Sequence, residues 1–170
     1  MPVASPAADP ALFRSVVGSF CSGLTVIAAT GPQGPLGMTC QSFISLSLDP
    51  PLVLFSPAKT STTWPRIREI GSFCINLLAE DHDQISAQMA RSGTDKFAGV
   101  TYDLSPLGAP RLAGVTAWLD CILHTEHDGG DHTIVVANVR DLAATHDTQP
   151  LLFHRGRYAR LSSSTTAERR

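Results

Sequence analysis

The sequence predicts a mainly β fold, an antiparallel β-barrel with a few short helices. Many short segments are rich in β-branched or aromatic residues, and Gly, Pro, Asn or Asp turn signals separate them. Few segments repeat apolar residues at helical spacing. The 170 residues, 43% of them hydrophobic, show no internal repeat and no domain boundary. A chain of this size can bury one core, and many short antiparallel strands are typical of a barrel.

The first helix is expected to begin at Asp9-Pro10, with Asp9 as the N-cap and Pro10 at the first helical position. Its apolar face consists of Phe13, Val16, Val17 and Phe20. Gly23 is a stop signal after it. Residues 24–30 then predict a strand, and the turn at residues 31–35 predicts a hairpin into residues 36–42.

Residues 37–51 combine a glycine with hydroxyl side chains at Thr39, Ser42, Ser45 and Ser47. Hydroxyls and backbone N–H groups at this spacing suit a phosphate or the polar edge of a ring, because each can donate. A Ser/Thr-rich strand pair whose hydroxyls cap turns is the alternative. The closing Asp49-Pro50-Pro51 marks the start of a short buried strand over residues 52–56.

The middle of the chain alternates helices and strands. Thr60 or Ser61 caps a helix through Ile70, with Pro65 in its first turn and Gly71 at its end. A strand is expected over residues 73–78. A capping box at residues 81–84 opens a helix through about residue 90, with Ile85 and Met89 on one face. A helical turn over 94–99 and a loop over 102–114 follow.

Residues 115–124 alternate and predict a strand with one face in the core. The apolar face is Val115, Ala117, Leu119, Cys121 and Leu123, and the other face is Thr116, Trp118, Asp120 and His124. A glycine-rich hairpin turn at 128–131 leads into a returning strand over 133–141. A final strand is expected at 151–153. We expect a flexible N-terminus over 1–8, one domain over 9–160 and a disordered tail over 161–170.

Composition excludes several partners. A formal net charge of −2 gives no basic footprint for nucleic acid. No apolar run is long enough to span a membrane, and residues 1–9 lack the features of a signal peptide, so we expect a cytoplasmic protein. A charged share of only 16% favours a surface partly covered by another subunit.

The four cysteines are widely spaced, form no CxxC pair and lie in apolar segments, so we expect reduced, buried residues and neither a disulfide nor a zinc site. They are Cys21, Cys40, Cys74 and Cys121.

Two further features could contact a ligand. His132 follows a glycine-rich turn and could reach into a cleft, although a solvated histidine at a plain hairpin tip is equally compatible. Tyr158, in Arg155-Gly156-Arg157-Tyr158, could stack on a planar ligand or simply cap the barrel surface.

The sequence carries no motif for metal or nucleophilic chemistry. His124, His127 and His132 would not converge on one ion along a strand and its turn, so we expect no metal site. The nucleophile elbow, the dinucleotide fingerprint and the P-loop are missing from the sequence. If the protein is an enzyme, its chemistry belongs to a bound cofactor.

Several ordered motifs resemble those of the short-chain flavin reductases, the reductase components of two-component flavin-dependent monooxygenases. The resemblance runs from Phe13 to Tyr158. It is carried by residues 20–26, 37–42, 45–53, 73–78 and 95–99, by Gly129-Gly130-Asp131-His132 and by Tyr158.

The resemblance implies a split-barrel FMN-binding fold, an antiparallel Greek-key barrel that forms a homodimer with flavin near the subunit interface. It implies an NAD(P)H:flavin oxidoreductase that reduces free FAD or FMN by hydride transfer. The reduced flavin would diffuse to a partner monooxygenase. The likeness is greatest to reductases that serve oxygenases of aromatic or polycyclic substrates and of natural-product tailoring.

Site residues are also implied by position. Gly37, Met38, Thr39, Gln41 and Ser42 would line the isoalloxazine and ribityl chain. The phosphates would meet Ser56, Pro57, Ala58, Thr62 and Thr63, at a helix start. Gln88 and Met89 would close over the flavin, His132 would hold the nicotinamide, and Tyr158 would stack nearby. No catalytic side chain is expected, because hydride transfer depends on cofactor positioning.

Three alternatives stay open at this point. Thr62-Thr63 replaces a basic or other polar residue found in relatives, so FAD and FMN are both possible, with FAD favoured. Arg155 or Arg157 could meet the 2′-phosphate of NADPH, although NADH is favoured. The protein could instead be a flavoprotein that holds FMN tightly as an electron carrier, or a non-catalytic dimeric barrel.

Overall fold

The structure is a computed structural model that describes residues 9–93, 95–145 and 148–162. The flexible segment predicted at 1–8 and most of the tail predicted at 161–170 lie outside these residues. The helices are α1 (Pro10–Val17), α2 (Trp64–Ile70) and α3 (Asp83–Ala90). The strands are β1 (Ser22–Gly23), β2 (Thr25–Gly31), β3 (Gly34–Cys40), β4 (Ile44–Leu48), β5 (Pro51–Phe55), β6 (Ser72–Leu77), β7 (Tyr102–Leu104), β8 (Pro110–Leu112), β9 (Ala117–Gly129), β10 (His132–Ala144), β11 (Leu152–His154) and β12 (Arg157–Ala159).

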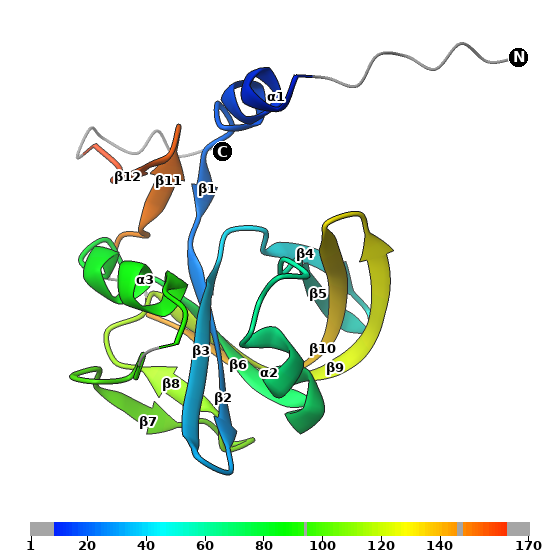
Figure 1. Ribbon diagram of the computed structural model, residues 1–170. Coiled ribbons are helices and arrows are strands. Elements are labelled where there is room, and N and C mark those ends of the chain that lie inside the picture. The colour runs from blue at the N-terminus through cyan, green and yellow to red at the C-terminus, as the bar shows by residue number, and fades with distance from the viewer. Residues whose placement is uncertain (1–8, 94, 146–147, 163–170) are drawn as a thin grey trace, which may run out of the picture.

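A seven-stranded antiparallel sheet forms the body, in the order β3-β2-β6-β9-β10-β5-β4 (Figure 1). This confirms the predicted mainly β, antiparallel class. β5 pairs with β10 and β6 returns beside β2, so the strand order departs from the sequence order, as a Greek-key arrangement requires. β3 and β4 are the two edges, so the barrel is open between them. Two smaller sheets, β1-β11-β12 and β7-β8, flank this body.

The main core lies inside the curved sheet, where α2 packs against β2, β3 and β6. Trp64 on α2 meets Phe55 and Phe73 edge to face, with ring centroids 5.2 and 5.8 Å apart. Such edge-to-face pairs add to the stabilisation from burial. A second apolar cluster lies under α3 and includes Met89 and Phe97. β2 separates the two clusters and is therefore buried on both faces.

The prediction that β9 has only one face in the core is wrong. Asp120 is fully buried, and Trp118 packs against the second cluster. The segment predicted as a loop over 102–114 contains the β7–β8 hairpin, and this segment covers the second face. The Asp120 carboxylate accepts hydrogen bonds from the Ser105 hydroxyl (2.6 Å) and the Leu107 N–H (2.7 Å), so this buried carboxylate has hydrogen-bond partners for both oxygens.

Helix ends agree with the sequence where a single residue sets them. Asp9 caps α1 by accepting from the N–H of Leu12, and Gly71, at φ +79°, ends α2. The Ser61 hydroxyl accepts from the N–H groups of residues 63 and 64, the bonds expected of the predicted cap, although α2 itself begins at Trp64.

Other predicted helix signals fail. α1 ends at Gly18, which leaves Phe20 beyond the helix. The predicted capping box of α3 is wrong, because the N-cap His82 makes no side-chain capping bond. The short helical turn predicted over 94–99, by contrast, agrees with the hydrogen-bonded turns that residues 96–99 form.

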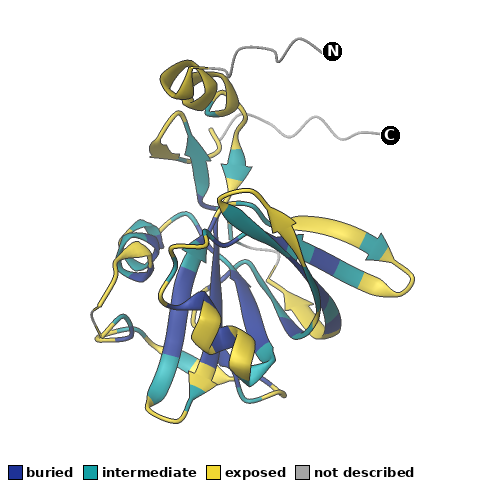
Figure 2. Ribbon diagram, turned by 45° about the vertical axis from the view of Figure 1, so that its right-hand side comes forward, coloured by how far each residue is buried: buried dark blue, intermediate teal, exposed yellow. Residues whose placement is uncertain are grey.

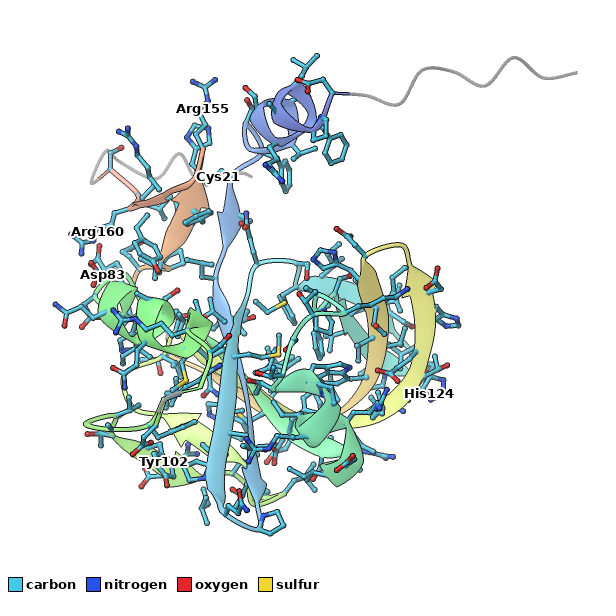
Figure 3. The ribbon with its side chains drawn as sticks, in the orientation of Figure 1. Cys21, Asp83, Tyr102, His124, Arg155 and Arg160 are labelled. Carbon is cyan, nitrogen blue, oxygen red and sulfur yellow. The ribbon has the colours of Figure 1, made fainter. Side chains whose placement is uncertain are left out.

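Three of the four cysteines are buried, but Cys21 is exposed, contrary to expectation. Cys21 lies where α1 leads into β1 (Figure 3). Burial and the nearby Asp120 carboxylate raise the pKa of Cys121 to about 12, and they also raise the pKa of Cys74. Within the described residues no cluster of His, Cys, Asp or Glu could hold a metal ion, and no helix is long and apolar enough to cross a membrane.

The predicted apolar face of α1 exists, but none of the helix residues is buried by the part of the chain that the structure describes. Figure 2 shows the helix exposed along its whole length, standing away from the body. Its large apolar side chains are exposed, as are those of the edge strand β4, where Leu48 is 90% exposed. They are Leu12, Phe13, Val16, Val17, Ile44, Leu46 and Leu48, with Phe20 just after α1.

Candidate functional site

A cavity of about 680 Å³ lies at the open side of the barrel, where β3 leads toward β4. Small-molecule and cofactor sites commonly have this size. Four parts of the chain line it: the end of β3 with the residues after it, the loop between β5 and α2, the end of α3 with the segment after it, and His132 at the start of β10. Val17, Phe20 and Ser22 add a wall from the N-terminal segment.

The Ser42 hydroxyl joins the two edges of the opening. It accepts from the Ser56 N–H at 2.7 Å and donates to the Ser56 carbonyl oxygen at 3.3 Å. The Thr39 hydroxyl donates to the carbonyl oxygen of Ser86 on α3 at 2.6 Å. These two hydroxyls therefore shape the cavity wall, in addition to any contact that they make with a ligand.

The β9–β10 hairpin fixes His132 at the rim of the cavity. The N–H of Thr133 donates to the Pro57 carbonyl at 3.0 Å, and the N–H of Lys59 donates to the Asp131 carbonyl at 2.9 Å. The Lys59 ammonium also pairs with the Asp128 carboxylate. His132 Nδ1 lies 2.6 Å from an Asp131 carboxylate oxygen, and this hydrogen bond, with the charge of the imidazolium, lowers the pKa of Asp131. The outer edge of the ring stays available, because the side chain is about half exposed.

Lys96 is a lining residue that the sequence reasoning did not identify as part of the site. Its ammonium donates to the carbonyl oxygens of Gly37 and Met89, both at 3.0 Å, and to the Thr63 hydroxyl at 3.1 Å. Desolvation lowers the pKa of this lysine. Residues 95–99 belong to one of the motifs that carry the resemblance. The sequence of a turn, however, does not indicate which distant segments a lysine side chain on it contacts.

Most of the residues predicted to bind flavin or nicotinamide line this one cavity. They are Met38, Thr39, Gln41, Ser42, Ser56, Pro57, Ala58, Thr62, Thr63, Met89 and His132. Their roles remain predictions, but segments far apart in the sequence do converge here.

Three predicted site residues lie elsewhere. Gly37 lies behind the cavity wall, where an added Cβ would come within 2.7 Å of the Met89 sulfur. The Gln88 amide donates to the carbonyl oxygens of Lys96 and Ala98, both at 2.9 Å, and so supports the turn that carries Lys96.

Tyr158 lies on β12, two strands from β1, and its ring packs on Phe153. It does not line the cavity of its own chain, so its nicotinamide contact remains a prediction. The same is true of Arg155 and Arg157; Figure 3 shows Arg155 beside α1.

The arrangement suits a flat amphipathic ligand with an anionic end. Met38, Met89 and Phe43 supply apolar walls, hydroxyls supply donors, and Lys96, whose three N–H groups bond to Gly37, Met89 and Thr63, supplies positive charge. Among the described lining residues, no hydrogen bond joins a hydroxyl or thiol to His132. An arrangement of this kind can hold a cofactor and a substrate in fixed positions.

Comparison with known proteins gives a consistent result. The model of the flavin reductase like domain matches residues 17–162. The reductase subunit HsaB of a flavin-dependent monooxygenase from Rhodococcus jostii is 46% identical over 164 residues, covering 96% of this chain and 84% of that protein. The FMN reductase (NADH) SmoA from Agrobacterium fabrum is 44% identical over 151 residues, with 88% and 85% covered.

Solved structures superpose on nearly the whole chain. The NADH:FAD oxidoreductase SgcE6 from Streptomyces globisporus, in complex with NAD and FAD fragments, superposes with a TM-score of 0.89 at 32% identity, covering 98% of this chain and 100% of that one. A homologue of nitrilotriacetate monooxygenase component B from Mycobacterium thermoresistibile also gives 0.89, at 43% identity, with 98% and 95% covered.

Proposed function

The chain belongs to the flavin reductase like domain family, and from that premise we propose that it is an NAD(P)H-dependent flavin reductase. It supplies reduced flavin to a separate flavin-dependent monooxygenase, as the reductase subunits among its relatives are named to do. The observation that carries the proposal is the cavity at the open barrel edge, which collects the predicted flavin residues and His132 around one space.

The cavity fits a flavin in shape and chemistry. Its volume and apolar walls suit the isoalloxazine ring, and the hydroxyls of Thr62 and Thr63 with the Lys96 ammonium suit a phosphate. The flavin, when bound, supplies the acceptor for a hydride from the nicotinamide.

The protein's contribution is to hold the two reactants in position. Ser42 keeps the opening at a fixed width through its two bonds to Ser56. His132, held by Asp131 and by the backbone of Pro57 and Lys59, holds the nicotinamide at the rim. Hydride transfer between two reactants held in position needs no protein nucleophile, because their proximity lowers the activation barrier of the transfer.

We favour NADH and FAD as the preferred pair. NADH appears in the names of both SmoA and SgcE6; for the flavin, SgcE6 is named for FAD and SmoA for FMN. Arg155 and Arg157, which could contact the 2′-phosphate of NADPH, do not line the cavity of this chain.

The decisive experiment is a matrix of initial rates with NADH or NADPH against FAD, FMN and riboflavin. A reductase is purified nearly colourless and oxidises NADH rapidly once flavin is added. Yellow protein that retains FMN on dilution and shows no turnover would instead support the electron-carrier alternative.

We also propose that the protein is a homodimer in the cytoplasm. The exposed apolar side chains of α1 and β4 form a surface of the kind that a second copy covers. Because Val17 and Phe20 also line the cavity, this second copy would lie close to the flavin.

A further inference from the structure

A second cavity, of about 550 Å³, adjoins the first. The two share Thr62, Thr63 and Lys96, so these residues form a common wall. The second cavity extends from that wall between Arg66 on α2 and the tip of the β2–β3 hairpin at Gln33 and Gly34. A ligand whose anionic group lies at the common wall would therefore have both spaces next to it.

The charges of the second cavity favour an anion. Arg66 lines it, and no ion pair involving this guanidinium is found among the described residues. The neighbouring Arg68, by contrast, pairs with Glu126 at 3.7 Å. Lys96 adds a second cation at the common wall. None of the described residues that line the second cavity is acidic.

The shape of the second cavity suits a flat group next to that anion. Gly34 and Gly93 present bare backbone, and a Cβ added at either position would meet nothing within 4 Å. An aromatic ring can approach such a surface closely, because no side chain stands in the way. The Gln33 amide offers both a donor and an acceptor for a heterocyclic base.

We propose that the second cavity binds the adenosine monophosphate half of FAD, with Arg66 as the residue that distinguishes FAD from FMN. This inference rests on the proposed function and adds to it the place and the determinant of flavin choice. FAD is FMN extended through a second phosphate to adenosine. With the first phosphate at Thr62, Thr63 and Lys96, the second phosphate lies within reach of the Arg66 guanidinium, whose planar fork matches phosphate oxygens.

The test compares Arg66→Gln with Arg68→Gln, a matched change two residues along the same helix. Each flavin-free protein is titrated with FAD, FMN and riboflavin, and binding is followed by flavin fluorescence. We expect Arg66→Gln to raise the Kd for FAD about 5- to 10-fold, as loss of one partly exposed charged contact does, and to leave FMN and riboflavin within about twofold. Arg68→Gln should leave all three unchanged.

A second measurement on the parent protein is independent of any variant. Adenosine monophosphate should compete with FAD for binding and should not compete with riboflavin, which has no adenylate. Equal weakening of FAD and FMN by Arg66→Gln, or competition of adenosine monophosphate with riboflavin, would overturn the inference. Either outcome leaves the proposed function standing if NADH oxidation continues with FMN. A parent protein that binds no flavin would overturn both the inference and the proposed function.

Discussion

The Lys96 ammonium donates to the carbonyl oxygen of Gly37 across 3.0 Å, although the two residues are 59 positions apart in the chain. The same ammonium holds Met89 on α3 and Thr63 at the start of α2. One side chain thereby joins β3, the start of α2 and α3 behind the first cavity. Its loss would leave three acceptors without their donor, which costs free energy because water does not fully replace a partner in a half-buried site.

Lys96→Met is expected to lower the free energy of unfolding of the flavin-free protein by about 1–2 kcal/mol. It should also weaken flavin binding, because it removes a cation from the cavity wall. Urea unfolding and fluorescence titration measure the two effects. Lys59→Met is the control, since Lys59 is half exposed and pairs with an exposed carboxylate, a type of contact worth little. Equal stability of the two variants would contradict the role of Lys96.

Gly37→Ala is expected to destabilise the protein by about 1–2 kcal/mol through overpacking. Its new Cβ would lie 2.7 Å from the Met89 sulfur and 3.0 Å from a ring carbon of Phe97, both in buried side chains. Thermal or urea unfolding measures the change. Gly23→Ala is the matched control, because a Cβ at Gly23 would meet no atom within 4 Å. If both variants unfold at the same denaturant concentration, Gly37 is not held in close contact.

Ser42→Ala is expected to raise the flavin Kd about 3- to 10-fold, because loss of the hydroxyl leaves the Ser56 N–H without its 2.7 Å acceptor and loosens the cavity opening. Fluorescence titration of the flavin-free variant gives the Kd. Ser45→Ala provides the comparison, since Ser45 lies on β4 with an exposed side chain and does not line the cavity. A Ser42→Ala protein that binds flavin as tightly as the parent would rule out this function of the hydroxyl.

The sequence located strands and turns well where one local signal determines them. The β2–β3 hairpin was predicted nearly to its ends, because Gly31 and Pro32 interrupt two apolar runs. Asp120 shows the limit of this approach. Alternation along a strand indicates which side chains share a face, but it does not indicate what covers that face. Here the β7–β8 hairpin covers it, and the two prolines and the glycine of that segment predict a loop.

The candidate site was predictable in part for the same reason. The hydroxyls near Ser42 and the glycine-rich turn before His132 are local patterns, and the structure brings both to one cavity. Lys96 and Arg66 have no such pattern, because their importance depends on which distant segments surround them. The apolar face of α1 is an intermediate case: its periodicity is visible in the sequence, but periodicity does not reveal that the described residues leave this face exposed.

His132→Ala is expected to raise the KM for NADH about 10-fold and to leave the flavin Kd within about twofold, because the ring lies at the rim of the cavity and not against its wall hydroxyls. Steady-state kinetics with each substrate varied in turn separates these effects. His127→Ala controls for a histidine change in the same hairpin, since His127 is exposed and does not line the cavity. An unchanged response to NADH would exclude His132 from nicotinamide binding.

Val16→Asp on α1 is expected to shift the protein from dimer to monomer at micromolar concentration, as measured by analytical ultracentrifugation. Val16 is exposed in the single chain and does not itself line the cavity, so its substitution should leave the fold of the single chain intact. In a twofold-symmetric dimer the change occurs twice and places two carboxylates in an apolar interface, which costs several kcal/mol.

Ser15→Asp adds the same charge on the adjacent, polar side of α1 and should leave the dimer intact. A parent protein that sediments as a monomer would overturn the proposed homodimer. If the dimer forms and Val16→Asp disrupts it, the rate with FAD should fall as well, because Val17 and Phe20, on either side of the α1 end, line the flavin cavity and would lose the subunit that fixes them.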